Sequence, residues 1–216
     1  MRTIQNQTFD EERALYGSND ILVKDCSFDG PADGESAFKE CKNVEVANGF
    51  FNLRYPFWHD HNLTIRDSEM TEHCRAALWY SDHISIGNTK LHGIKALREC
   101  ADVIMTGCDV NSPEFGWSVH NMEMKDCTAE SEYFMMRSTG LHFTNVRMKG
   151  KYSFQYIENS IFEKLHLRYQ GRFLACKKCH RPQQYCERRV LAGIARMLPL
   201  KIAKSSVHSL CVIAKD

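Results

Sequence analysis

The sequence predicts an all-β chain folded as a parallel β-solenoid. Three observations predict this fold: a repeat of 19–23 residues, about three short apolar stretches within each repeat, and no apolar periodicity of helical length. A period in this range is typical of repeat architectures in which each repeat forms one coil. A leucine-rich repeat has a similar period, but its Leu-x-x-Leu-x-Leu consensus is absent.

An alternating apolar triplet preceded by a polar residue marks the start of each coil. The first triplet residues are Ile21, Val44, Leu63, Ile84, Val103, Met122, Leu141 and Ser160. Successive starts differ by 23, 19, 21, 19, 19, 19 and 19 residues. The preceding residues are Asp20, Asn43, Asn62, His83, Asp102, Asn121, Gly140 and Asn159. Asn and Asp tolerate the left-handed backbone of a sharp turn, so we expect a corner at this position of every coil.

Apolar residues also recur at two other positions of each coil, at the same spacing as the triplets. Seven residues after each start stand Phe28, Phe51, Met70, Leu91, Val110, Ala129, Met148 and Leu167. Six residues before the next start stand Phe38, Phe57, Leu78, Leu97, Gly116, Met135 and Phe154. We expect these columns to fill the interior, with equivalent residues stacked about 4.8 Å apart.

The composition is that of an ordinary globular protein, with 43% hydrophobic and 25% charged residues and a net charge of +1. This balance gives no basis for non-specific nucleic-acid binding. No apolar run approaches the roughly 18 residues of a membrane span, and the first residues lack the apolar core of a secretory signal. We therefore expect a cytoplasmic protein that binds neither membrane nor nucleic acid, requires no cofactor, and keeps its ten Cys as thiols.

The charged residues are distributed unevenly on the two sides of Glu163. Residues 1–163 hold 16 Lys and Arg against 25 Asp and Glu, whereas residues 164–216 hold 12 against 2. The aromatic residues fall from 20 in the first part to 3 in the second. We accordingly divide the chain into an N-terminal cap at 1–19, about seven β-helix coils at 20–163, and a tail at 164–216.

The tail has the features of a sequence read out of frame. Under one choice of codons, Gly171 to Cys179 shifted by one base reads Asp-Ala-Phe-Trp-His, which is similar to Tyr55-Pro56-Phe57-Trp58-His59. A second match to the coil pattern lies near Met197, one 19-residue repeat further along the chain. It requires a different shift of the reading frame from the first match. We interpret residues 164–216 as a frameshifted tail with little or no native structure. A solenoid cut in this way exposes an uncapped end, through which we expect self-association.

Four strings of the sequence are long and specific: Thr8-Phe9-Asp10-Glu11-Glu12-Arg13-Ala14-Leu15-Tyr16, residues 28–41, residues 53–59 and Cys74-Arg75-Ala76-Ala77-Leu78-Trp79-Tyr80-Ser81. They resemble an uncharacterised bacterial family of pectin-lyase-like β-helix proteins. The resemblance covers about residues 3–163. It implies a right-handed parallel β-helix and no particular activity, because the family is a domain of unknown function.

One outward-facing column suggests a ligand-binding surface. Five residues before each coil start, the sequence places Trp58, Trp79, Arg98 and Trp117 beside an inward-facing column. Trp faces stack on sugar rings, and cations pair with carboxylates. The candidate binding residues are therefore Arg54, Trp58, His59, Arg75, Trp79, Lys95, Arg98 and Trp117. The competing interpretation is that the column only packs along the solenoid.

These residues support two classes of function. The first is binding or processing of an acidic polysaccharide, which in an enzyme would mean a polysaccharide lyase or a glycoside hydrolase, with catalytic residues unknown. The second is a non-catalytic cytoplasmic scaffold that binds a protein partner. Fold resemblance favours the first but does not establish an activity.

The sequence assigns no metal site. His59 and His61 alternate along a strand and face the same side, but no third ligand lies beside them. Cys176-Lys177-Lys178-Cys179-His180, with Cys186, resembles half of a zinc site or a haem-attachment string. Because these residues lie in the tail, the frameshift interpretation makes that pattern accidental.

The frameshift hypothesis predicts a discontinuity in the gene. Sequencing the source DNA should reveal an insertion, such as an additional A within the codons for Glu163 and Lys164, and further β-helix coils in the restored frame. An uninterrupted, well-supported frame through residue 216 would contradict the hypothesis.

Overall fold

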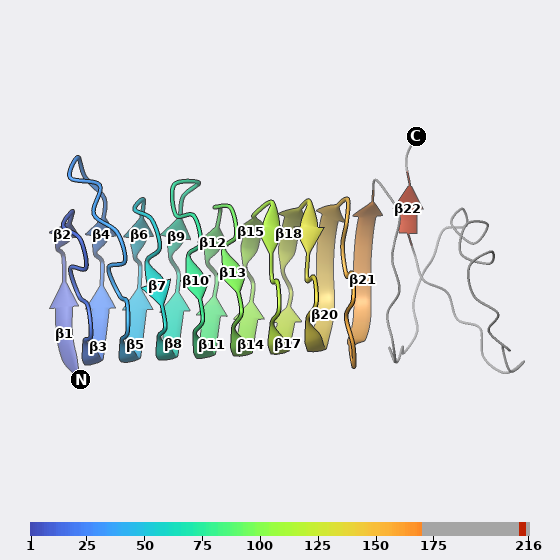
Figure 1. Cartoon of the computed structure of the whole chain (residues 1–216), viewed down its shortest axis with the longest axis horizontal. Coiled ribbons are helices and arrows are strands. Elements are labelled where there is room, and N and C mark those ends of the chain that lie inside the picture. Colours follow the sequence, from blue (N-terminus) through green and yellow to red (C-terminus); the bar gives the residue numbers. More distant parts are fainter. Residues whose placement is uncertain (170–211, 215–216) are drawn as a thin grey trace, which may run out of the picture.

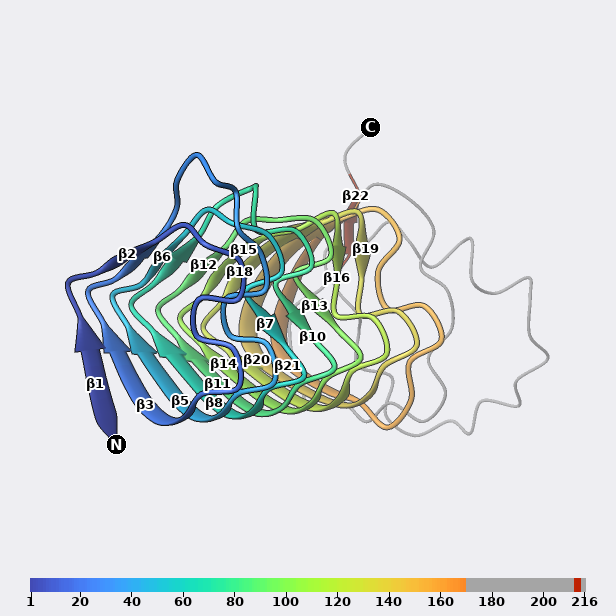
Figure 2. The ribbon, with the colours of Figure 1, turned by 60° about the vertical axis from the view of Figure 1, so that its left-hand side comes forward.

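Parallel strands stack along a single axis to form a β-solenoid (Figure 1). The computed structural model describes residues 1–169 and 212–214. In this part of the chain every element is a strand, which confirms the predicted all-β class. Figure 2 shows the coils lying one behind another, with their corners aligned. No helix long and apolar enough to cross a membrane occurs among the described residues.

Three sides of the solenoid are formed by three sets of strands. The first set is β1 (Arg2–Gln5), β3 (Asn19–Lys24), β5 (Lys42–Ala47), β8 (His61–Arg66), β11 (Asp82–Gly87), β14 (Ala101–Thr106), β17 (His120–Lys125), β20 (Thr139–Gly150) and β21 (Ile161–Tyr169). The second is β2 (Thr8–Phe9), β4 (Ser27–Phe28), β6 (Phe50–Phe51), β9 (Glu69–Met70), β12 (Lys90–Leu91), β15 (Asp109–Asn111) and β18 (Thr128–Ser131). The third is β7 (Phe57–Trp58), β10 (Leu78–Trp79) and β13 (Leu97–Arg98), with β16 (Glu114–Phe115) and β19 (Tyr133–Phe134) pairing separately. Finally, β22 (Val212–Ala214) pairs with β21.

The predicted register is confirmed at the coil starts. Val44 pairs with Leu63, Leu63 with Ile84, and Ile84 with Val103, all between parallel strands. The second apolar column also stacks as expected, since Phe28 pairs with Phe51. The spacing of triplets in the sequence therefore corresponds to the physical spacing of coils.

The strands of the first set show nine coils rather than the predicted seven or so. One additional coil lies within residues 1–19, where Ile4 pairs with Val23 and Phe9 with Phe28. The other is formed by β21, which continues past Glu163 to Tyr169 along β20. The first of these coils has too weak a triplet to be recognised, whereas the start of the last at Ser160 was recognised but the coil was taken to end at Glu163. Residues 170–211 and 215–216, which hold most of the proposed frameshifted tail and all of its Cys-x-x-Cys string, lie outside the described residues, and the frameshift stays a prediction.

Stacked phenylalanines fill the N-terminal half of the interior. The ring centroids of Phe28 and Phe51 lie 4.8 Å apart with an interplanar angle of 2°, and Phe38 stacks on Phe57 at 4.9 Å. All four side chains are fully buried. Since each buried aromatic contributes a large apolar area, these columns supply much of the hydrophobic stabilisation of the stack.

The interior column continues through Gly116 with the predicted alignment. Trp117 pairs with Arg98, and Gly116 N donates to Leu97 O at 2.8 Å. Gly116 therefore lies beside Leu97 and is buried, while the buried aromatic of that coil is its neighbour Phe115. Gly116 adopts a φ of +73°, and a Cβ there would lie 2.3 Å from the sulfur of Met135 in the next coil. Glycine fits this position because Met135 occupies the space that a side chain would need.

The predicted left-handed corners are confirmed. All eight residues that precede the triplets have positive φ, between 50° and 70°. Asn side chains at this corner donate hydrogen bonds to the preceding coil: Asn43 Nδ2 to Asp20 Oδ1 and Asn62 Nδ2 to Asn43 Oδ1, both at 2.8 Å. The type of residue thus meets two needs at once, since it accepts the backbone conformation and links neighbouring coils.

A second set of side chains satisfies buried amides inside the turns. Gly49 N donates to Ser68 Oγ at 2.9 Å, Ser68 N to Thr89 Oγ1 at 3.3 Å, and Cys108 N to Cys127 Sγ at 3.3 Å. A buried amide without a partner is costly, so this column needs small side chains that accept hydrogen bonds. This explains why Ser, Thr and Cys recur there.

Substitution of Asn43 tests the two roles of the corner residue. Asn43→Val should lower the free energy of unfolding by about 2 kcal/mol or more, because it removes the ladder hydrogen bonds and places a β-branched residue at a φ of +53°. Asn43→Gly removes the same bonds without the strain and should cost about 1 kcal/mol less. Urea denaturation measures both values, and equal losses in the two variants would contradict this assignment.

Candidate functional site

Four of the predicted site residues form one continuous stack, here called the aromatic–arginine ladder: Trp58, Trp79, Arg98 and Trp117. The indoles of Trp58 and Trp79 lie parallel, with centroids 5.3 Å apart. The Arg98 guanidinium carbon lies 5.0 Å from the centroid of the Trp79 ring and 5.3 Å from that of Trp117. Parallel pairing of these positions in neighbouring coils creates the stack, so the predicted alignment is present.

Other groups of the protein already accept hydrogen bonds from the indoles of the ladder and cover both faces of Trp79. Each indole N–H donates to a backbone carbonyl: Trp58 to Ala76 at 2.8 Å, Trp79 to Lys95 at 2.7 Å, and Trp117 to Tyr133 at 3.3 Å. Trp79 is covered on one face by Trp58 and on the other by Arg98. All four side chains are half-buried, and Trp58 and Trp117 each have one ring face covered within the ladder.

An exposed aromatic pair adjoins the ladder at the corner that follows it. Tyr80 is 41% exposed and lies edge-on to both Trp58 and Trp79. His59 stacks on Tyr80, with ring centroids 5.0 Å apart. Of the eight predicted residues, His59 therefore joins the ladder through Tyr80, whose exposure the sequence did not reveal.

The remaining cations lie apart from the ladder. Arg54 and Arg75 line a shallow groove of about 650 Å³ whose walls include none of the ladder residues. Asp33 and Glu35 neutralise Arg54 at 3.1 and 3.6 Å, whereas the side chain of Arg75 has no ion-pair partner among the described residues. Lys95 pairs with Glu114 at 3.8 Å. The structure thus divides the candidates between two surfaces, and their role in binding stays a prediction.

Asp60 carries the most unusual carboxyl of the described chain. It is 2% exposed, Oδ1 accepts a 2.8 Å hydrogen bond from Cys41 N, and Oδ2 has no hydrogen-bond partner among the described residues. Burial raises the pKa of Asp60 to about 8, although the Cys41 amide opposes this shift. In the neighbouring coils Cys41 and Ser81 occupy the same position, so a carboxyl is not required by the fold.

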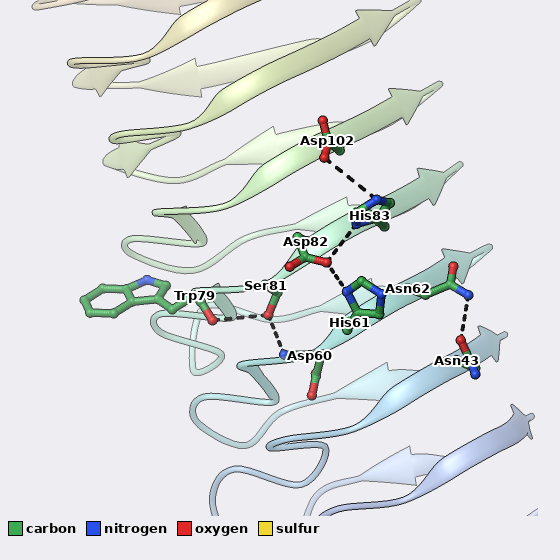
Figure 3. Close-up of polar contacts among 9 residues, drawn as sticks. All are labelled: Asn43, Asp60, His61, Asn62, Trp79, Ser81, Asp82, His83 and Asp102. Atoms are coloured by element: carbon green, nitrogen blue, oxygen red, sulfur yellow. Dashed lines mark hydrogen bonds and ion pairs between the residues drawn. The ribbon is translucent and has the colours of Figure 1, made fainter.

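Beside Asp60, three polar side chains from two coils converge at the surface (Figure 3). Asp82 Oδ1 contacts the Nδ1 atoms of both His61 and His83, at 2.8 Å in the case of His83. The hydrogen bond that His83 makes to the Asp82 carboxylate raises the pKa of His83. Burial alone would raise the pKa of Asp82, but the hydrogen bonds from His83 and His61 lower it. Two imidazoles and one carboxylate with their ligand atoms within 4.8 Å of one another could hold a metal ion.

This cluster was missed because two of its three members, Asp82 and His83, come from the coil that follows His61. The sequence predicts His59 and His61 on one side of a strand, but His59 turns to Tyr80 while His61 pairs across the coils with Asp82. Only the exact step of 21 residues between these two coils places Asp82 beside His61. The repeat spacing contains this information, because it determines which polar residues of neighbouring coils lie side by side.

Comparison with known families gives one decisive match. The sequence profile of the family described as "Protein of unknown function (DUF3737)" matches residues 2–202. The chain belongs to this family. Membership in DUF3737 supports the predicted resemblance to an uncharacterised family, and the structure supports its β-solenoid form. The pectin-lyase-like assignment and the bacterial origin stay predictions.

Two solved structures are similar to this DUF3737 chain. PfbA, a surface adhesin of Streptococcus pneumoniae, shares 13% identity at a TM-score of 0.37, over 82% of this chain and 70% of the adhesin. HetL, a pentapeptide repeat protein involved in heterocyst differentiation regulation in Nostoc sp. strain PCC 7120, shares 7% identity at a TM-score of 0.29, over 81% of this chain and 84% of HetL. These likenesses are too distant to transfer a function. No curated protein matches the sequence.

The raised pKa of Asp60 predicts a specific dependence of stability on pH. The unfolded carboxyl titrates near about 3.9, and the folded one at about 8. The folded state therefore holds a proton that the unfolded state releases between these values. The stability associated with that proton is fully present below the unfolded pKa and is lost as pH rises toward 8.

Asp60→Ser, which copies Ser81 of the next coil, removes this ionisation. Its advantage over the wild type in free energy of unfolding should widen by up to about 1.4 kcal/mol per pH unit between pH 4 and 8. Urea denaturation in buffer containing EDTA at several pH values measures the difference, with Asp60→Asn as a second neutral variant. A difference that stays constant with pH would show that Asp60 ionises normally in the folded protein.

Proposed function

We propose that this DUF3737 protein is a non-catalytic scaffold whose aromatic–arginine ladder, together with His59 and Tyr80, binds a protein partner. The observation that carries the proposal is the coverage of the indole faces by one another and by Arg98. A sugar ring stacks on an open aromatic face, whereas Trp79 has both faces covered and Trp58 and Trp117 have one face covered each. A stacked surface of Trp, Tyr and Arg is better suited to a protein partner.

The composition of this surface supports the same conclusion. Trp, Tyr and Arg are the residue types enriched among interface residues whose truncation costs the most binding energy. Their side chains are held by the stack and by the indole hydrogen bonds, so little conformational entropy would be lost on binding. Arg98 also pairs with Glu99 at 3.4 Å, which keeps the guanidinium over the rings.

Binding of an acidic polysaccharide is the second candidate. It is supported by the exposed ring of Tyr80 and by Arg75, which has no ion-pair partner among the residues described here. This version places the ligand across the edge of the ladder and the groove of Arg54 and Arg75, rather than on the indole faces.

Site-specific photo-crosslinking in cells tests the proposal. A photoreactive phenylalanine analogue in place of Tyr80 should yield a discrete crosslinked protein, and Arg98→Ala should reduce the yield about tenfold by loosening the ladder. Tyr156 is the matched control, because it occupies the same left-handed corner in a coil remote from the ladder and is 68% exposed. The analogue at position 156 should not yield the same product.

A glycan array distinguishes the two candidates. Under the scaffold proposal, the purified chain gives no signal on uronate-containing glycans. Binding to such glycans that is lost on Tyr80→Ala or Arg75→Ala, without a crosslinked protein at position 80, would overturn the scaffold proposal in favour of the polysaccharide.

A further inference from the structure

The His61–Asp82–His83 cluster has a composition that its structural role does not require. His61 begins β8, Asp82 begins β11 directly beside it, and His83 follows at the left-handed corner. Their side chains are 52%, 44% and 58% exposed, so the ion pairs among them contribute little to stability. The stacking of coils nevertheless brings two imidazole nitrogens to one carboxylate oxygen.

His83 interrupts a column in which the other coils carry Asp, Asn or Gly. On one side Asn62 donates to Asn43, and on the other Asn121 donates to Asp102 at 3.1 Å. Among the described residues no hydrogen bond joins His83 to Asn62. Instead its Nδ1 turns to Asp82, and its Nε2 lies 3.9 Å from Asp102 Oδ2. An Asn would continue the ladder, so the imidazole suits a different purpose.

The ligand set selects the kind of ion. Imidazole nitrogens favour Zn²⁺ and its transition-metal neighbours, whereas Mg²⁺ and Ca²⁺ prefer oxygen ligands alone. Zn²⁺ binds His nitrogen and carboxylate oxygen at about 2.0–2.2 Å, which places tetrahedral ligand atoms about 3.3–3.5 Å apart. The ligand atoms of the cluster lie within 4.8 Å of one another, with 2.8 Å between His83 Nδ1 and Asp82 Oδ1, so small side-chain movements reach this arrangement.

We propose that His61 Nδ1, Asp82 and His83 Nδ1 form a surface zinc site, with the fourth position open to water. Zn²⁺ takes the place of the Nδ1 protons that now join the imidazoles to the carboxylate; a neutral imidazole then carries its proton on Nε2, and a protonated one releases its Nδ1 proton to solvent. Asp102 lies on the Nε2 side of His83, where a carboxylate orients a metal-bound imidazole. The site is separate from the aromatic–arginine ladder, so the inference stands independently of the proposed function.

The repeat provides substitutions that preserve the fold. His83→Asn copies Asn62 and Asn121 of the same column, Asp82→Ala copies its strand partner Ala101, and His61→Lys copies its strand partner Lys42. Each variant should keep the β-sheet circular-dichroism spectrum and the melting temperature of the wild type in EDTA. His92→Asn is the matched control, because His92 Nε2 pairs with Asp109 Oδ2 at 3.0 Å without a second imidazole.

Isothermal titration with Zn²⁺ above neutral pH tests the site in the full chain. All samples carry Cys176→Ser and Cys179→Ser, because thiolates there would also bind zinc. We expect one equivalent of Zn²⁺ to bind, with affinity reduced about 10-fold or more by each of the three cluster variants and changed less than about 2-fold by His92→Asn. Zn²⁺ should raise the melting temperature of the parent protein and not that of His83→Asn.

Two outcomes would overturn the proposal. One is a parent chain whose affinity for Zn²⁺ is no greater than that of the three cluster variants. The other is a loss in His92→Asn as large as that in His83→Asn, which would mean that any surface histidine beside a carboxylate gives the same weak binding.

Discussion

The solenoid depends on hydrogen bonds that run between coils at its left-handed corners. Each corner turns the backbone sharply and leaves an amide or a side chain directed at the neighbouring coil. Asn at the outer corner and Ser, Thr or Cys in the interior turns supply the partners, as in Asn62 to Asn43 and Gly49 to Ser68. Thirty non-glycine residues of the described chain have positive φ, and fourteen of them are Asn or Asp. Such a backbone is maintained because most coils provide a partner for the coil beside them.

The same register that satisfies the corners determines the chemistry of the outer surface. Pairing of Leu78 with Phe57 inside the solenoid places Trp79 on Trp58 outside it. Pairing of Ile84 with Leu63 likewise places Asp82 beside His61. Surface groups that are 19–21 residues apart in the sequence thus become neighbours without any loop or domain movement. In a solenoid, the candidate sites are therefore consequences of core packing.

The fold was largely predictable because its signal is repeated. Inward positions such as Val44 and Leu63 recur at fixed steps, and the polar residue before each triplet predicted the left-handed corner correctly. The first coil was missed because its triplet, Arg2-Thr3-Ile4, contains one apolar residue, too few to be recognised. The place of Gly116 in the interior column was predicted correctly, but the filling of its side-chain space by Met135 of the next coil depends on contacts in three dimensions.

The candidate site was less predictable than the fold. The sequence identified the column of Trp58, Trp79, Arg98 and Trp117, but not that the rings cover one another. The alternation of inward and outward residues is the same whether such rings stack on one another or line an open groove. Likewise, the burial of Asp60 follows from its place inside a turn where the equivalent residue is Ser81. The zinc ligands required pairing between coils, because neither His61 nor His83 has a partner in its own coil that completes a ligand set.

The most direct test of this account is a series of spin-label distances along one outer row of the solenoid. Glu45, Ile104, Glu123 and His142 occupy equivalent positions in successive pairings of the first strand set. Labels attached by chemistry that does not involve thiols, one at Glu45 and one at each of the other three in turn, should give mean distances of about 14, 19 and 24 Å, rising by about 4.8 Å per coil. A distance from Glu45 to His142 no longer than that to Ile104 would contradict the stacked, in-register solenoid.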